Sequence, residues 1–292
     1  MRTATETLVT IGDCQLFVRE LGTGHPLIAL HGGPEFDSFY LVPELDALAG
    51  CCRLIYYDQR GRGRSAAAPA EQVTIESEVD DLDRLRDSFG ADSIAVLGHS
   101  WGGVLAMEYA TEHPDRVSHL ILLNTAPASA RDWTDFLPTW RGQRSQQDAE
   151  ALTSLTASAA FVAGDVHADT ALYRIVFRNA TRRAELDDQI VGRLRAHFTP
   201  DRIVASHVIE DRLFAQTLEL DGYDLVPRLH ELAMPALVVH GEDDFVPVAM
   251  AARIADAIPG ARIDVLPACG HFSYAERPEA VRDVICAFLR SP

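Results

Sequence analysis

Residues 98–102 read Gly-His-Ser-Trp-Gly and fit the G-x-S-x-G pattern, which constrains this chain more than any other feature. An apolar run at residues 94–97 precedes the pattern, and a helix-like stretch at 104–110 follows it. In that context the serine lies on a tight turn from a strand to a helix, with its hydroxyl exposed. The alternative is an ordinary turn that matches by chance. We take Ser100 as the candidate nucleophile, which requires a base, an acid and an oxyanion hole elsewhere in the chain.

Short apolar runs alternate with amphipathic stretches near both ends of the chain. The expected strands cover residues 16–21 (as the edge strand of a hairpin), 26–30, 53–57, 94–97, 117–123, 236–240 and 262–266. The clearest helix follows Thr74, a good N-cap residue, and ends at Gly90; further helices are expected near 248–257 and 280–289. Strands alternating with helices indicate an α/β fold with a mostly parallel central sheet flanked by helices.

This rhythm breaks after Pro127. Residues 131–230 contain no convincing strand but several helical stretches, at 171–179, at 188–198 and from Thr199-Pro200, where a proline occupies the first helical position. We therefore predict an all-helical cap inserted into the α/β core. The expected division is a first core segment at residues 1–127, a helical cap at 128–232 and a second core segment at 233–292.

A serine hydroxyl is a poor nucleophile unless a general base lies within hydrogen-bond reach. His271 is the candidate base because, of the 11 histidines, it alone lies on a glycine-containing loop after a late strand. A surface histidine is the alternative interpretation.

The acid that orients the base is expected in residues 241–244, Gly-Glu-Asp-Asp, at the carboxyl end of an expected strand. Catalytic groups in such sheets gather at the carboxyl ends of the strands. Asp244 is favoured over Asp243 by its position three residues after the glycine. The other aspartate and Glu242 are then loop-capping or solvated groups. The resulting chain order, Ser then Asp then His, fits a serine on a strand-to-helix turn.

Acyl transfer also needs hydrogen-bond donors aimed at the developing oxyanion. The backbone N–H of Trp101, which follows the candidate nucleophile, is one by position. Residues 31–34, His-Gly-Gly-Pro, offer the N–H of Gly33 as the second, while Pro34 cannot donate and stiffens the loop. A plain turn after a strand is the alternative.

Three arginines, Arg60, Arg62 and Arg64, raise the question of phosphate binding. Their glycine spacing is not that of a P-loop, so we expect a structural turn with solvated arginines, braced by Asp58. The chain contains no H-E-x-x-H pattern, and its histidines lack ligand spacing, so no metal is expected. No G-x-G-x-x-G opens a helix after a strand. We therefore expect no cofactor.

Composition bounds the partners. With 43 acidic and 26 basic residues, the formal net charge of −17 argues against nucleic acid or an anionic membrane surface. No stretch approaches the roughly 20 apolar residues that span a bilayer, and residues 1–9 lack the apolar segment of a secretory signal. Five cysteines, an odd number without C-x-x-C spacing, favour reduced structural thiols in a cytoplasmic protein.

Four segments together resemble a known family: residues 31–34, 57–61 (Tyr-Asp-Gln-Arg-Gly), 98–103 and 270–272 (Gly-His-Phe). They are similar to the α/β-hydrolase fold, and in particular to its proline iminopeptidase (prolyl aminopeptidase) branch. The resemblance implies Ser100, Asp244 and His271 as a catalytic triad. It also implies an oxyanion hole at Gly33 and Trp101, and a helical cap.

In the aminopeptidases, glutamates of the cap hold the substrate's free amino group. Glu210, within residues 209–214, is similar to one such position, although an exposed helix glutamate is the alternative. The chain departs from the family at Glu35, where glycine usually follows His-Gly-Gly-Pro. That carboxylate either narrows the pocket or itself binds an amine. The cap also lacks a second convincing glutamate motif.

The sequence therefore predicts a serine hydrolase that cleaves a small amide or short peptide with a free N-terminus, proline first, through an acyl-enzyme. An esterase or amidase acting on a small metabolite is the alternative within the same class. A non-catalytic binding module, or a cofactor-free lyase or cyclase using His271 as its base, represents a different class. Convergence of Glu35 and Glu210 on the cleft would favour the aminopeptidase, and an apolar cleft the esterase. The sequence is silent on the oligomeric state.

Overall fold

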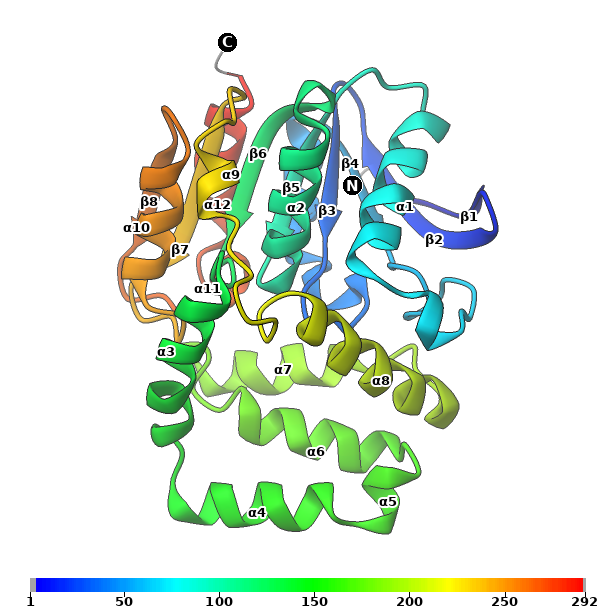
Figure 1. The fold of residues 1–292 in the computed structure, drawn as a ribbon, viewed down its shortest axis with the longest axis vertical. Helices are drawn as coiled ribbons and strands as arrows, with labels where there is room; N and C mark the ends of the chain where they lie inside the picture. Colours follow the sequence, from blue (N-terminus) through cyan, green and yellow to red (C-terminus); the bar gives the residue numbers. More distant parts are fainter. Residues whose placement is uncertain (1–3, 291–292) are drawn as a thin grey trace.

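The computed structural model describes residues 4–290, and an eight-stranded sheet forms its centre (Figure 1). The strand order is β1-β2-β4-β3-β5-β6-β7-β8. The strands are β1 (Thr5–Ile11), β2 (Cys14–Gly22), β3 (Pro26–Leu30), β4 (Arg53–Tyr57), β5 (Ile94–His99), β6 (Val117–Leu123), β7 (Ala236–Gly241) and β8 (Arg262–Leu266). β2 pairs antiparallel with β1 and β4, and all the other pairs are parallel. The predicted mostly parallel sheet is confirmed.

One strand prediction was wrong. We expected residues 16–21 to form the edge strand, but β2 lies inside the sheet and β1 forms the edge, paired from Thr5↔Glu20 to Ile11↔Cys14. β1 is almost wholly exposed, so its sequence carries no apolar alternation that would reveal it. Pairing with β2 positions it, and only its last residues reach the first core, where Ile11 is buried and Val9 packs against it. The prediction that residues 1–9 lack a secretory signal falls partly on residues 1–3, which lie outside the described residues.

Two hydrophobic cores cover the two faces of the sheet. Successive residues of a strand point to opposite faces, so Ile28 of β3 joins one core and Leu27 the other. The first core packs against α1 (Ile75–Ser88), α2 (Trp101–Glu112) and α10 (Val248–Ala257), and the second against α12 (Pro278–Phe288) and the 3-10 helix η2 (Glu44–Gly50). Thr74 caps α1 as predicted, with Ser77 completing a capping box.

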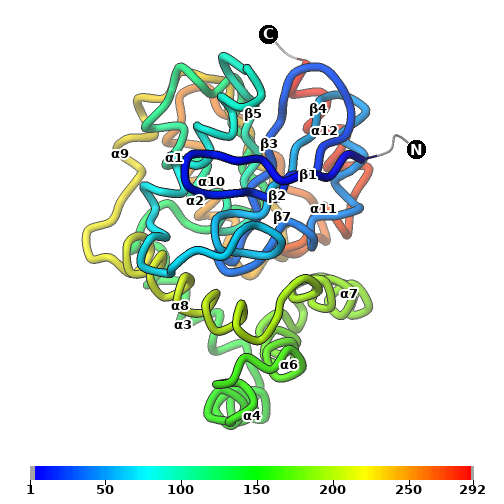
Figure 2. Tube along the Cα trace, turned by 90° about the vertical axis from the view of Figure 1, so that its right-hand side faces the viewer, coloured from blue at the N-terminus to red at the C-terminus, as the bar shows by residue number. Residues whose placement is uncertain are grey.

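Six helices between β6 and β7 form a separate layer on one side of the molecule, which we call the helical layer (Figures 1 and 2). They are α3 (Ala130–Gly142), α4 (Gln146–Thr156), α5 (Ala159–Val162), α6 (Val166–Val176), α7 (Ala184–Leu194) and α8 (Pro200–Gln216). The expected helices at 171–179 and 188–198 are α6 and α7, each beginning several residues earlier, and α8 starts at Pro200 as predicted. Within residues 4–290 the only β pairing in this region is an isolated bridge between Ser129 and Asp224. The division at residues 127 and 232 stays a prediction.

The remaining short helices, α9 (Val226–Leu229) and α11 (Ser273–Glu276), connect core elements, as do η1 (Ser38–Leu41), η3 (Ala70–Gln72) and η4 (Pro114–Arg116).

The cysteines correct a second expectation. Cys51 and Cys286 form a disulfide between residues 235 positions apart, so the predicted reduced state was wrong for these two. α12 packs on η2, which brings the two side chains together, and no local spacing in the sequence could show this. Cys14, Cys52 and Cys269 are buried free thiols. Among the described helices, none is both long and apolar enough to cross a membrane.

Candidate active site

Ser100 lies on the predicted turn between β5 and α2. Its backbone adopts φ 56° and ψ −125°, a conformation that residues other than glycine rarely hold. A Cβ on Gly98 would overlap the backbone of Gly102, and one on Gly102 would overlap the carbonyl group of Leu30. The turn therefore needs both glycines for close packing, which explains the G-x-S-x-G pattern physically.

The structure brings Ser100, His271 and Asp244 together in one hydrogen-bonded row. Ser100 Oγ lies 3.0 Å from His271 Nε2, and His271 Nδ1 lies 2.9 Å from Asp244 Oδ1. His271 and Asp244 are buried, whereas Ser100 is partly open to the cavity described below. Each residue follows the carboxyl end of a strand: Ser100 follows β5, Asp244 follows β7 and His271 follows β8. A base placed this way can take the serine proton while the carboxylate fixes its orientation.

Asp244 is held as an anion by its surroundings. Burial would raise the pKa of Asp244, but attraction to His271 and His240 and hydrogen bonds from His271 and Asn124 outweigh it and lower that pKa. The amide of Asn124 donates to Asp244 Oδ2 over 2.8 Å and also to the carbonyl of Gly270. Sequence reasoning missed Asn124. It directly follows β6, so the same strand-end signal that identified Asp244 could have found it.

The neighbouring acids take the other roles expected of them. Asp243 is exposed and lies 3.5 Å from Arg182, away from His271. Glu242 accepts a hydrogen bond from the backbone N–H of Ala268 and so caps the following loop. The preference for Asp244 over Asp243 agrees with this geometry.

The candidate oxyanion donors lie around the same serine. Gly33 and Trp101 both line the cavity that contains Ser100. Trp101 is the first residue of α2, where a helix leaves its N–H groups without an intrahelical acceptor. Gly33 has φ +117°, which other residues avoid, so this loop conformation depends on glycine. The use of these two N–H groups as an oxyanion hole stays a prediction.

A buried histidine ties the loop, the turn and the base together. The N–H of Gly32 donates to the Tyr40 hydroxyl over 2.7 Å, and that hydroxyl donates to His99 Nδ1 over 2.8 Å. His99 Nε2 in turn donates to the carbonyl oxygen of His271. Burial lowers the pKa of His99 to about 3, so the ring is neutral and can accept and donate in this order. Sequence reasoning did not single out His99 or Tyr40.

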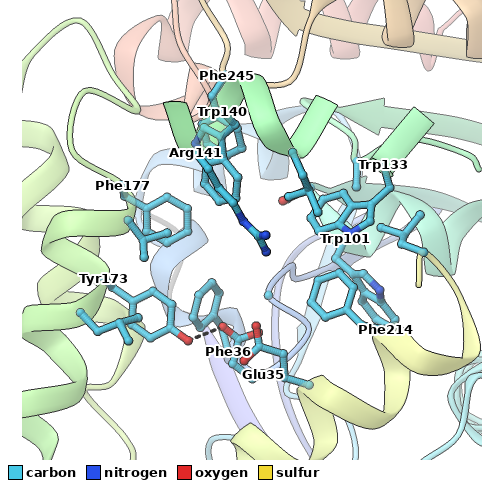
Figure 3. A pocket seen from close by; sticks show the side chains of 18 of the residues that line it. Glu35, Phe36, Trp101, Trp133, Trp140, Arg141, Tyr173, Phe177, Phe214 and Phe245 are labelled. Carbon is cyan, nitrogen blue, oxygen red and sulfur yellow. Dashed lines mark hydrogen bonds between the residues drawn. The ribbon is translucent and has the colours of Figure 1, made fainter. Parts of the chain in front are cut away.

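A cavity of about 520 Å³ opens between Ser100 and the helical layer. This volume falls within the range of small-molecule sites. Much of the wall is aromatic, contributed by α3, α6, α8 and the loops after β3 and β7 (Figure 3): Phe36, Trp133, Trp140, Tyr173, Phe177, Phe214 and Phe245. The charged residues of the wall are Glu35, Arg141, Arg144, Asp211, Glu219 and Glu210, with His207 beside them.

The structure brings the two predicted glutamates to this one cavity. Glu35 is buried, and its Oε1 accepts a 2.6 Å hydrogen bond from the Tyr173 hydroxyl. Its second oxygen, Oε2, has no hydrogen-bond partner among the described residues. Burial raises the pKa of Glu35, and burial together with the charge of Glu35 raises the pKa of the half-buried Glu210 well above its usual value. Two neighbouring acids, one of them buried with an oxygen that lacks a hydrogen-bond partner, suit the binding of a cation.

Arg195 fixes Glu35 from behind. This buried side chain donates to the backbone oxygen of Glu35 over 2.9 Å and to the Tyr173 hydroxyl over 3.2 Å, and pairs with Asp169 at 2.5 Å. Asp169 also accepts from His207. No local sequence pattern signals this network, because its members come from α6, the end of α7, α8 and the loop after β3.

The arginine turn corrects a third expectation. Arg60 and Arg62 are buried, not solvated, because α1 supplies their partners: Arg60 pairs with Asp81 at 2.6 Å and Arg62 with Glu78 at 2.7 Å. Asp58 braces the turn as predicted, by accepting from Arg64 and the Ser38 hydroxyl. In residues 4–290, no group of three His, Cys, Asp or Glu side chains is placed to hold a metal ion.

Comparison with known proteins defines the class. The family model described as the alpha/beta hydrolase fold matches residues 25–278, so the chain belongs to the α/β-hydrolase fold family. The predicted fold class is thereby confirmed, and the chain is a hydrolase with a serine at the nucleophile position.

Several individual proteins are similar over nearly the whole chain. The proline iminopeptidase of Lactobacillus delbrueckii subsp. bulgaricus is 27% identical, covering 100% of this chain and 99% of its own length. A protein of Caulobacter sp. (strain K31) with the name "Putative carbamate hydrolase" is 28% identical over 89% of this chain and 94% of its own length. The crystal structure of proline iminopeptidase from Mycobacterium smegmatis is 27% identical with a TM-score of 0.72, covering 98% and 97% of the two chains. The resemblance to the proline iminopeptidases is confirmed, while the specific activity stays open between these chemistries.

Proposed function

We propose that this chain is a serine aminopeptidase that releases an N-terminal residue, proline first, from short peptides or small amides. One observation carries the proposal: Glu35 and Glu210 line the same cavity as Ser100. Two carboxylates beside a nucleophile suit a substrate whose cationic amine lies next to its scissile carbonyl. The similarity to proline iminopeptidases supports the same activity. The helical layer is then the substrate-binding cap.

The proposed reaction begins at Ser100. His271 Nε2 takes the hydroxyl proton as Oγ attacks the carbonyl carbon, and the N–H groups of Gly33 and Trp101 stabilise the resulting oxyanion. The intermediate collapses, the C–N bond breaks, and His271 returns the proton to the leaving amine. A water molecule then attacks the acyl-enzyme, giving its proton to His271, and the free amino acid leaves as Ser100 regains its hydrogen. Asp244 orients His271 throughout and stabilises its cationic form.

The proposed amine site works by charge compensation. Before substrate binds, two neighbouring carboxylates in a buried site resist ionisation, as their raised pKa values indicate. An ammonium group donates hydrogen bonds to Glu35 Oε2 and to Glu210 and favours the ionised form of both. Tyr173 and Arg195 keep Glu35 in place, so little reorganisation is needed.

The test compares two chromogenic substrates, a prolyl arylamide and a short-chain aryl ester. We expect efficient hydrolysis of the arylamide by the wild-type enzyme, and loss of nearly all turnover in Ser100→Ala. Negligible arylamide turnover beside rapid ester cleavage would overturn the aminopeptidase. Substantial activity in Ser100→Ala would instead point to the lyase or cyclase chemistry with His271 as the base.

An esterase or amidase acting on a small metabolite is the second candidate. The aromatic wall of the cavity, which includes Trp133, Trp140 and Phe245, favours an apolar acyl group. The Caulobacter relative, which is about as similar as the proline iminopeptidases, is named for a different substrate, a carbamate. The buried glutamates weigh against it, because an uncharged substrate would leave them unpaired.

The proposed partner is therefore a small molecule or short peptide. The cytoplasm is the proposed location, and the Cys51–Cys286 disulfide weighs against it because disulfides persist mainly in oxidising compartments. Cell fractionation decides the location directly: recovery with the secreted or periplasmic proteins would overturn it.

A further inference from the structure

Arg141 is an exposed cation on the wall of the proposed substrate cavity, without a side-chain partner among the described residues. It lies in the last turn of α3, and Figure 3 shows its guanidinium projecting into the cavity from the wall opposite Glu35. Among the described residues this guanidinium makes no hydrogen bond and no ion pair. Acidic partners are not scarce in a chain with 43 acidic and 26 basic residues. A cation left free on the cavity wall is therefore available to an anionic group of the ligand.

Arg144 adds a second cation on the same wall. Its guanidinium lies over the Trp140 ring, 4.8 Å from the centroid, and its Nε is buried without a hydrogen-bond partner. Burial and the nearby charge of Arg141 lower the pKa of Arg144, while the charge of Asp148 opposes this shift. The two guanidinium groups of the cavity wall therefore repel each other. An anion bound between the two guanidinium groups would relieve that repulsion.

The cavity thus has two oppositely charged ends. Glu35 and Glu210 form the acidic end, Arg141 and Arg144 the basic end, and Ser100 lines the same space. Asp211 and Glu219 are the other acids of the wall. A dipeptide carries the matching groups, an ammonium at its N-terminus and a carboxylate one residue beyond the scissile bond. The volume of about 520 Å³ suits a ligand of this size and not a long chain.

We infer that Arg141, assisted by Arg144, binds the free carboxylate of the leaving residue, so that the preferred substrates are dipeptides with an unblocked C-terminus. This inference rests on the proposed aminopeptidase function and names its substrate class. Arg141 is then a specificity-determining residue: it contacts the leaving group and takes no part in proton transfer. Substrates without that carboxylate are cleaved without its help.

The test compares prolylalanine, prolylalanine amide and a prolyl arylamide. We expect the wild-type enzyme to prefer prolylalanine to its amide by about tenfold or more in kcat/KM, because a charge-assisted pair is lost in the amide. Arg141→Gln should likewise lower kcat/KM for prolylalanine by about tenfold or more and change the values for the other two substrates by less than about threefold. Arg131→Gln is the matched control, since Arg131 lies on the same helix, is exposed and pairs only with Asp135.

Two results would overturn the inference: equal wild-type kcat/KM for prolylalanine and its amide, or an equal loss for all three substrates in Arg141→Gln. The second outcome would mean that Arg141 affects the cavity in the same way for every substrate and does not bind the leaving-group carboxylate. Failure of the proposed function looks different, because the arylamide would then not be cleaved at all. Calorimetric binding to Ser100→Ala makes the same comparison without turnover, and tighter binding of prolylalanine than of its amide is the expected result.

Discussion

Single residues decide the chemistry of this site, and those at strand ends are the easiest to find from sequence. Ser100, Asp244 and His271 each follow a strand whose apolar run is visible in the chain, so all three could be predicted. Asn124 also follows a strand end directly, but its amide cannot act as a nucleophile, acid or base, so it was not predicted. Tyr173 and Arg141 could not be predicted, because their place in the cavity depends on how α6 and α3 pack over the sheet.

The choice between two adjacent aspartates gives the first prediction. Asp244→Asn should lower kcat by about 10⁴-fold, because an amide stabilises the wrong tautomer of His271 and no longer stabilises its cationic form. Asp243→Asn is the matched control: this side chain is exposed and pairs with Arg182, so kcat should change by less than about twofold. Steady-state kinetics on the prolyl arylamide measures both. The reverse order of effects would assign the acid to Asp243.

The raised pKa values of Glu35 and Glu210 predict a pH dependence for amine substrates. Below these pKa values the acids are neutral and bind an ammonium weakly. As pH rises through them, kcat/KM for the prolyl arylamide should increase relative to that for an aryl ester, until the substrate amine loses its proton. Taking the ratio of the two kcat/KM values removes the effect of groups whose titration affects both reactions equally.

Glu210→Gln should flatten this rise, while Asp201→Asn, an exposed residue on the same helix, should preserve it. A ratio that stays constant with pH in the wild-type enzyme would contradict the role of the glutamate pair.

At the scale of elements, sequence periodicity located most strands and core helices, but it did not show which elements contact one another. β3, β4, β6, β8 and α10 cover the residues expected for them, because their apolar runs are short and clearly bounded. β1 was not predicted because most of its residues are exposed, so its sequence shows no clear apolar pattern. Burial of the arginine turn could not be predicted, because its acidic partners lie on α1, too far along the chain for a local sequence pattern to reveal them.

Burial of Arg62 against Glu78 gives a prediction of stability. Arg62→Met should lower the free energy of unfolding by about 3–5 kcal/mol, because it leaves a buried carboxylate without its partner. Glu78→Leu added to that variant should restore part of the loss. Arg84→Gln, which removes an exposed pair with Asp80, should cost less than about 1 kcal/mol. Chemical denaturation measures all three, and a loss below about 1 kcal/mol for Arg62→Met would refute the buried pair.

At the scale of the whole molecule, the helical layer and the sheet make one site between them. Ser100 and the loop at Gly33 belong to the sheet side, whereas Glu210 and Arg141 come from the helical layer. Arg195 links the two by holding the backbone of Glu35 together with Asp169. The family resemblance could suggest Glu210, but only the packed structure shows that the helical layer brings charges of both signs over one serine.

The most direct test of the account is how strongly the enzyme requires a free amine. The measurement is the ratio of kcat/KM for a prolyl arylamide to that for its N-acetylated form, at a pH where the amine is protonated. If Glu35 and Glu210 hold an ammonium group beside Ser100, the ratio should exceed about 30, since breaking a buried charge pair costs about 2–5 kcal/mol, or about 30- to 5,000-fold. A ratio within about threefold of one would contradict the amine site and with it the aminopeptidase.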